Sequence, residues 1–202
     1  MSTEADERAN LVRAAWAVLR RSGFDGFKVR LVMRESGLSA RTFYRHFPDK
    51  DALLVAMIRD EYSGFARLLT EMTAEAGSDP EAAVSCWIRE FLIGLSDPAR
   101  EARARVFTAH HAVMWKHPDA TAEANQLVIE PLRTAIDRGV EMGVFACTDP
   151  ASDALQISRL VSGALNEVLS QRPSPPDVTD VIESTTAFAL KALSVATPTQ
   201  RP

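Results

Sequence analysis

The sequence predicts an all-α protein of about nine helices. Apolar residues recur three and four positions apart through most of the 202 residues, as they do along one face of a helix. Glycine, proline and aspartate stand between these stripes, where helices begin and end. No segment alternates apolar and polar residues over the length of a half-buried strand. The pattern therefore gives no support for a sheet.

Three short helices are expected first. One covers residues 11–23 and another residues 29–37, since each stripe is followed by a glycine that can end a helix. The third begins after Ser39, whose hydroxyl can accept an unpaired backbone N–H of the first turn. Pro48 ends it, because proline cannot continue the backbone hydrogen bonding.

Six longer helices follow. Asp49 can cap the fourth, which is long enough to connect two domains. Asp-Pro pairs predict three further starts, because aspartate caps a helix and proline suits its first position. The remaining helices are expected over 80–95, 98–113, 119–139, 150–168 and 178–193. Pro131 should kink the helix over 119–139.

Charge is distributed unevenly along the chain. The net charge is −4, but residues 8–50 hold ten Lys and Arg against three acids, giving +7, whereas residues 51–202 hold 13 basic and 21 acidic residues, giving −8. A basic segment followed by an acidic one suggests a head that binds phosphates and a body with other partners. Uneven solvation of helix surfaces is the alternative explanation.

Several protein classes find no support in the sequence. No apolar run approaches the roughly 18 residues of a membrane span, and the first residues lack the order of a secretory signal. Cys86 and Cys147 have no CxxC or Cys/His spacing, so neither a zinc site nor a disulfide framework is predicted. We expect a cytoplasmic protein with no cofactor, no metal and no membrane partner. Residues 1–7 and 196–202 are expected to be loose ends.

Residues 29–47 have the pattern of a helix-turn-helix, in which two short helices meet at a tight turn at Gly37. Phe43 and Phe47, four residues apart, should face a core with Leu38, Val29 and Val32. The polar face of the second helix then points outward with Ala40, Arg41, Thr42, Tyr44, Arg45 and His46. In this motif the second helix enters the DNA major groove. A polar helical hairpin inside a bundle is the alternative.

The pattern G-F-x(4)-V-x(2)-V-x(4)-G-L-S-x-R-T-F-Y-R-H-F-x(2)-K-x-x-L, from Gly23 to Leu53, resembles the tetracycline-repressor (TetR) family of transcription regulators. The resemblance implies a three-helix DNA-binding head, residues 1–50, and a helical ligand-binding and dimerisation domain, residues 51–202. It also implies a homodimer that binds a near-palindromic double-stranded DNA operator and is released by a small-molecule effector. The motif covers about the first quarter of the chain, and the remainder matches in architecture only.

The resemblance also assigns DNA-contacting residues. Tyr44, His46 and Lys50 match positions that bind the DNA backbone, and Lys50 stands in a first helical turn, where a lysine is unfavourable unless it meets an anion. The full predicted DNA-binding set is Arg30, Ser39, Ala40, Arg41, Thr42, Tyr44, Arg45, His46 and Lys50.

Two residues depart from the family pattern. Lys28 replaces a capping threonine, so the second helix begins earlier, near Asp25, or has a weaker cap. Arg41 replaces a small residue and can bind guanine through O6 and N7, which predicts a guanine in each half-site.

Large polarisable side chains in the body can line a small-molecule cavity. The predicted pocket residues are Trp87, Phe91, Phe107, His111, Met114 and Trp115. At helical spacing such residues are also typical of an ordinary core, and both interpretations stay open. The segment HHAVMWKH supplies only adjacent and distant histidine pairs, a poor match to a zinc site.

Small residues on two C-terminal helices predict a dimer interface, because they let helices approach closely. The predicted interface residues are Ser158, Ser162, Gly163, Leu165, Thr185, Phe188, Ala189 and Ala192. Packing of the same faces within one chain is the alternative.

The leading functional hypothesis is a ligand-responsive DNA-binding repressor. A DNA-binding regulator or activator without an inducer is the second. An all-helical enzyme is the third and has least support, since no nucleophile elbow, phosphate loop, dinucleotide fingerprint or HExxH motif is present.

Overall fold

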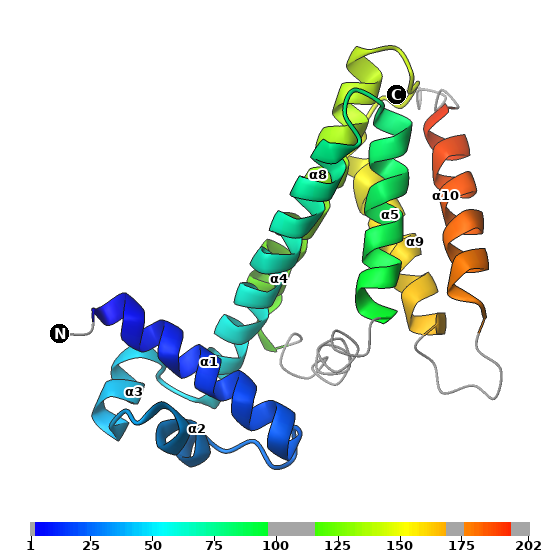
Figure 1. The fold of residues 1–202 in the computed structure, drawn as a ribbon. Helices are drawn as coiled ribbons and strands as arrows, with labels where there is room; N and C mark the ends of the chain where they lie inside the picture. The colour runs from blue at the N-terminus through cyan, green and yellow to red at the C-terminus, as the bar shows by residue number, and fades with distance from the viewer. Residues whose placement is uncertain (1–2, 97–115, 169–175, 195–202) are drawn as a thin grey trace. The chain divides into compact units, whose positions relative to one another are not determined.

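The computed structural model describes residues 3–96, 116–168 and 176–194, and within these ranges every regular element is a helix (Figure 1). The helices are α1 (Glu4–Ser22), α2 (Val29–Ser36), α3 (Ala40–His46), α4 (Lys50–Glu75), α5 (Pro80–Ser96), α8 (Pro118–Glu141), α9 (Pro150–Val168) and α10 (Val178–Ser194). The predicted all-α class is confirmed. Each of the eight corresponds to an expected helix, and the ninth, over 98–113, lies outside the described residues.

Aspartates begin the longer helices as predicted. Asp49 accepts a hydrogen bond from the Ala52 backbone N–H at 2.7 Å, and Asp79 accepts one from Ala82 at 3.1 Å. Asp149 does the same for the N–H of Ser152 at 3.0 Å. Each carboxylate satisfies a donor that has no partner within its own helix and places a negative charge at the positive end of the helix dipole.

The N-terminus differs from expectation. Thr3 caps α1 by accepting a hydrogen bond from the Asp6 N–H at 3.2 Å, while the Asp6 carboxylate accepts the Thr3 N–H at 2.9 Å. This reciprocal capping box satisfies two donors and starts α1 at Glu4. The prediction of a loose end was therefore wrong for residues 4–7. The first helical turn was missed because it carries no apolar stripe.

The described residues fall in two compact units. The first contains residues 3–62 and 116–124, and the second contains residues 63–96, 125–168 and 176–194. Both α4 and α8 continue from one unit into the other. A domain boundary at residue 50 stays a prediction.

A continuous apolar core holds the first unit together. Phe27, Phe43 and Leu11 are each at most 2% exposed, and they pack with residues of α1, α2 and the start of α4. Burial of one such side chain contributes about 1.5–3 kcal/mol. The three short helices around this core form the head, residues 3–47, in which α1 packs on α2 and α3 (Figure 1).

The second unit has a separate core around α5. Trp87 is completely buried, and its indole N–H donates to the Val128 carbonyl of α8 at 3.0 Å. The ring centroids of Trp87 and Phe91 are 5.0 Å apart, and those of Phe91 and Phe65 of α4 are 5.5 Å apart. Helices α5, α9 and α10 pack against one another (Figure 1).

Pro131 lies inside α8, which is one helix over its full length, and the expected kink stays a prediction.

Helices α9 and α10 each have an inner and an outer face. Leu165, Thr185 and Ala189 are buried within the chain, which favours the alternative of packing within one chain at these positions. Their assignment to a dimer interface stays a prediction. Ser158 and Ser162 are half-buried. Gly163 and Ala192 are exposed, and Phe188 is 63% exposed. Small residues let helices approach, but they do not determine which neighbour approaches.

A glycine near the end of α8 makes room for an aromatic ring. A Cβ on Gly139 would lie 2.0 Å from Cδ2 of Phe145, whose side chain is buried. The backbone N–H of Phe145 also donates to the Gly139 carbonyl at 3.0 Å. The segment after α8 therefore turns back onto its last turn, and an added methyl group would have to displace a buried ring.

We expect Gly139→Ala to destabilise the protein by about 1–3 kcal/mol through overpacking, which outweighs the gain of up to about 1 kcal/mol in helix propensity. Thermal unfolding followed by circular dichroism measures the effect. Gly64→Ala in α4 is the matched control, because apart from the neighbouring residues and backbone of its own helix no atom lies within 4 Å of the added Cβ. That control should be neutral or stabilising. Equal melting temperatures for both variants would contradict this account.

Candidate nucleic-acid interface

The turn between α2 and α3 is fixed by a glycine and two side chains. Gly37 adopts φ 69° and ψ 11°, a left-handed conformation that L side chains adopt rarely. The amide of Asn10 on α1 donates to the Ser36 carbonyl at 3.1 Å, which satisfies an acceptor at the end of α2. Ser36 Oγ accepts the Leu38 N–H at 3.3 Å. The predicted helix-turn-helix is therefore present with its expected turn.

Helix α3 is capped where the sequence predicted. Ser39 Oγ accepts the Thr42 N–H at 3.1 Å and lies 3.0 Å from Thr42 Oγ1. Phe43 and Phe47 are 0% and 3% exposed, and their ring centroids are 5.9 Å apart. These two rings fix the rotation of α3 about its axis, because they seat one flank in the core of the head.

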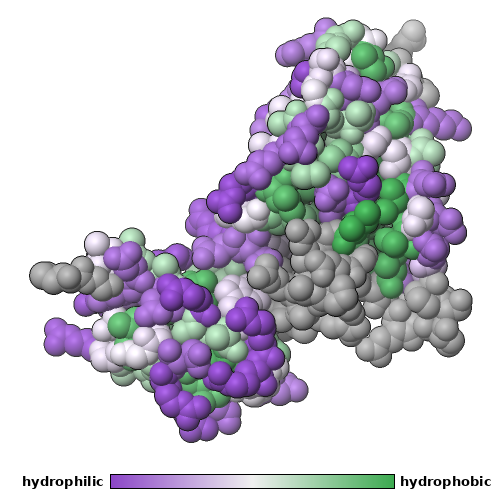
Figure 2. All heavy atoms as spheres, in the orientation of Figure 1, coloured by the Kyte–Doolittle hydropathy of each residue, from purple (hydrophilic) through white to green (hydrophobic). Residues whose placement is uncertain are grey.

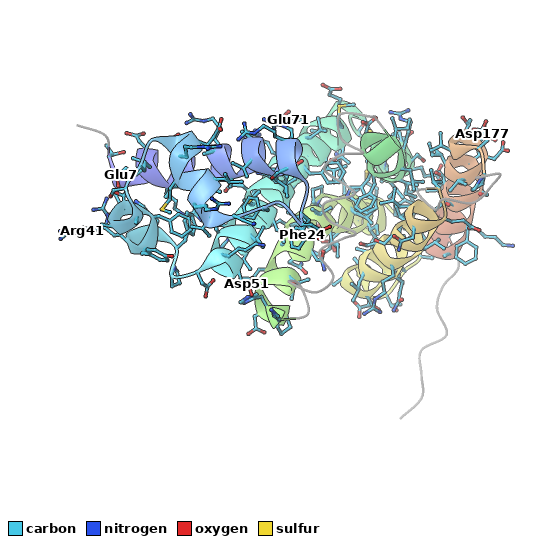
Figure 3. The ribbon with its side chains drawn as sticks, turned by 90° about the horizontal axis from the view of Figure 1, so that it is seen from below. Glu7, Phe24, Arg41, Asp51, Glu71 and Asp177 are labelled. Atoms are coloured by element: carbon cyan, nitrogen blue, oxygen red, sulfur yellow. The ribbon has the colours of Figure 1, made fainter. Side chains whose placement is uncertain are left out.

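The opposite flank of α3 carries the exposed polar residues. Tyr44 is 58% exposed and its ring packs edge-on against Phe43, at 5.2 Å between centroids. Arg41 projects outward from α3 (Figure 3). The other exposed members of the predicted set are Arg30, Ser39, Ala40 and Arg45, while Thr42 and Lys50 are half-buried. Figure 2 shows that the visible surface of the head is mostly hydrophilic.

His46 does not face outward as predicted. Its side chain is 4% exposed, and its Nε2 lies 3.0 Å from Oε2 of Glu7 on α1. The same carboxylate oxygen accepts a hydrogen bond from the guanidinium of Arg45. Glu7 therefore contacts two side chains of the last turn of α3, those of Arg45 and His46. Sequence reasoning missed this residue, because nothing local to Glu7 indicates a partner 38 positions away.

The ionisation of Glu7 follows from these contacts. The hydrogen bonds from His46 and from Arg45 hold the pKa of Glu7 below its ordinary value of 4.5. The carboxylate is therefore negatively charged at neutral pH. One unit of negative charge thus lies at the C-terminal end of the helix expected to meet DNA.

Lys50 is positioned by two aromatic rings. Its Nζ lies 4.9 Å from the centroid of Phe24 and 5.4 Å from that of Phe27. Such cation–π contacts restrain a flexible side chain without neutralising its charge. The ammonium group therefore remains available to an anion.

The second helix begins at Val29, with Lys28 at the N-cap and no side-chain hydrogen bond to the cap. The expected weaker cap is confirmed, and the alternative start near Asp25 was wrong.

The predicted pocket is described only in part. Trp87 is core and Phe91 is half-buried beside it, as the alternative interpretation proposed. The other four predicted pocket residues lie outside the described residues: Phe107, His111, Met114 and Trp115.

Within residues 3–96, 116–168 and 176–194, no three or more His, Cys, Asp or Glu side chains are grouped to hold a metal ion. None of the helices described there is both long and apolar enough to cross a membrane.

The chain is similar to known regulators in sequence. Residues 11–57 match the model of "Bacterial regulatory proteins, tetR family", a segment that includes the whole helix-turn-helix. The HTH-type transcriptional repressor KstR of Rhodococcus jostii is 25% identical over 195 residues, which cover 94% of this chain and 85% of that protein.

Solved structures share the fold. RolR in complex with resorcinol superposes with a TM-score of 0.69 at 19% identity, covering 95% of this chain and 89% of RolR. FadR of Bacillus subtilis in complex with stearoyl-CoA gives a TM-score of 0.64 at 14% identity, covering 90% of this chain and 97% of FadR. At these identities the similarity concerns the fold.

Proposed function

We propose that the chain is a TetR-family transcriptional regulator that represses transcription as a homodimer, and that a small molecule releases it from a near-palindromic operator. It is a regulator and not an enzyme, since the curated relatives it resembles are named repressors. The observation that carries the proposal is the exposed flank of α3, held outward by the buried Phe43 and Phe47. A helix presented in this way can enter the major groove with its N-terminal residues at base edges.

The proposed contacts divide into two kinds. Arg41 and Ala40, at the start of α3, are placed to meet base edges, and Arg30 on α2 is an additional candidate. Thr42, Tyr44 and Lys50 are proposed to bind phosphates, and Ser39 lies beside them at the helix N-terminus, where anions are favoured. His46 is left out of the contacting set because its side chain is almost fully buried against Glu7.

Arg41 should determine one base in each half-site. We expect Arg41→Ala to lose preference for a guanine there, at about 1–3 kcal/mol, because alanine cannot bind guanine O6 and N7. Selection of bound duplexes from a randomised library measures the preference. Arg34→Ala, which removes the same charge from an exposed position on α2, is the control and should keep the guanine. An unchanged base preference in Arg41→Ala would refute the assignment.

The outer faces of α9 and α10 are the proposed dimer interface. The argument rests on Phe188, which is 63% exposed, beside the exposed Ala192 on the same face of α10. A large exposed aromatic side chain is typical of an interaction surface. A two-fold dimer would place two heads about 34–36 Å apart, one turn of DNA.

We expect Phe188→Arg to convert the dimer into a monomer, since it places a charge in an apolar interface. Light scattering measures the mass in solution. Glu183→Arg adds an arginine about 140° away on α10 and should leave the dimer intact. A folded Phe188→Arg protein that stays dimeric would place the interface elsewhere.

The second unit is the proposed effector-binding domain. Two structural neighbours hold chemically different ligands, resorcinol in RolR and stearoyl-CoA in FadR, so the shared fold does not select one chemical class. Helices α4 and α8 are the proposed mechanical connection, because each continues into the head-containing unit. Lys116 also lies 3.4 Å from Asp51 at the start of α4, and Arg59 lies 3.6 Å from Glu123 of α8.

An effector must weaken DNA binding by the ratio of its affinities for the free and bound conformations. We therefore expect an effector, as a compound that binds the DNA-free conformation more tightly, both to raise the melting temperature of the free protein and to lower its affinity for the selected duplex. Thermal shift and DNA binding, measured on the same compound panel, test the coupling. A panel in which stabilising compounds leave DNA binding unchanged would favour a regulator without an inducer.

A further inference from the structure

Glu7 joins the first helix of the head to the last turn of α3. Its Oε2 accepts a hydrogen bond from Arg45 and lies 3.0 Å from Nε2 of His46. The Glu7 side chain is 19% exposed and that of His46 is 4% exposed, whereas Arg45 remains 51% exposed. Figure 3 shows Glu7 beside α3, on the same side of the head as Arg41. The carboxylate is thus enclosed on one side by His46 and open to solvent beside Arg45.

We propose that Glu7 is a specificity-determining residue that holds Arg45 away from DNA phosphates and so suppresses sequence-independent binding. The inference rests on the proposed DNA-binding function and concerns how the same surface distinguishes operator from other DNA. In this proposal the partner of Arg45 is Glu7 and not DNA, although the sequence analysis placed Arg45 among the DNA contacts. Arg45 is a positioning residue in this account, because it acts on α3 through Glu7.

The physical basis is competition between two anions for one guanidinium. Sequence-independent affinity comes from phosphates that Lys and Arg neutralise, and each such contact adds about 0.9 to the slope of log affinity against log salt. While Glu7 offsets its charge, Arg45 offers a phosphate little net attraction, and giving its full charge to a phosphate would leave a partly enclosed carboxylate without that partner. The exchange yields little net attraction for DNA of any sequence. Contacts made by Arg41 to a base are not subject to this competition.

The contact also restrains α3. Phe43 and Phe47 fix the rotation of the helix, and Glu7 connects its last turn to α1 through two side chains. A well-held helix favours a single register on the duplex. Release of Arg45 should add a phosphate contact on any duplex and leave α3 less restrained. Binding to other sequences should therefore increase more than binding to the operator.

The test is Glu7→Gln, an amide of the same shape that can still accept a hydrogen bond from His46 but carries no charge. Binding is measured to a random-sequence duplex of about three helical turns and to the duplex selected from the library, between about 50 and 200 mM salt. We expect roughly threefold to tenfold tighter binding to the random duplex near 100 mM salt, and a salt slope steeper by about 0.9 per head. The preference for the selected duplex should fall.

Glu4→Gln is the matched control, because it removes one negative charge from the same helix one turn earlier. It should change random-duplex binding less and leave the salt slope unchanged. A second arm places Arg45→Ala in both backgrounds. It should reverse the gain in Glu7→Gln and have little effect on random-duplex binding in the wild-type background.

An equal effect of Glu7→Gln and Glu4→Gln would overturn the inference, and so would loss of a full phosphate contact on Arg45→Ala in the wild type. A general loss of affinity in Glu7→Gln with an unchanged slope would also contradict it, since that is the result of a purely structural contact. Failure of the wild type to bind any duplex would instead refute the proposed function, so the two failures are distinguishable.

Discussion

The head depends on the burial of Phe43 and Phe47. Phe43 lies in α3, a helix of seven residues, and Phe47 is the residue that caps its C-terminal end; both are in the core of the first unit. A helix this short has little stability of its own in water, so tertiary packing must hold it. The same packing decides orientation, because a helix with one flank seated in the core must present the other flank to solvent. Exposure of Arg41 and Tyr44 is thus a consequence of the aromatic pair.

The ends of α3 are determined by separate local interactions. Gly37 provides the left-handed residue that lets α2 end, and Ser39 caps the next helix two residues later. Asn10 then connects the end of α2 to α1, and Glu7 connects the end of α3 to the same helix. Helix α1 is therefore the support for both halves of the motif. This explains how a segment with three acidic residues in its first turns belongs to an otherwise basic head.

Local features of the structure were predictable from the sequence, whereas long-range polar contacts were not. Gly23, Gly37 and the caps Ser39, Asp49 and Asp149 act within a few residues of themselves, and their types alone indicate what they do. The contact of Glu7 with Arg45 spans 38 positions and has no periodic signal. His46 was placed outward because α3 was treated as having one polar face, whereas α1 supplies a polar partner on its flank. Leu165, Thr185 and Ala189 have small or apolar side chains suited to any close helix contact, so only the structure identifies their neighbours.

The central claim is that α3 lies in the major groove, and the most direct measurement is dimethyl sulfate protection of the duplex selected by the wild-type protein. Guanine N7 is in the major groove and adenine N3 is in the minor groove, so the two methylation sites report the groove that is occupied. The account predicts protection of guanine N7 in both half-sites, about one helical turn apart. Protection confined to adenine N3, with every guanine N7 still reactive, would contradict it.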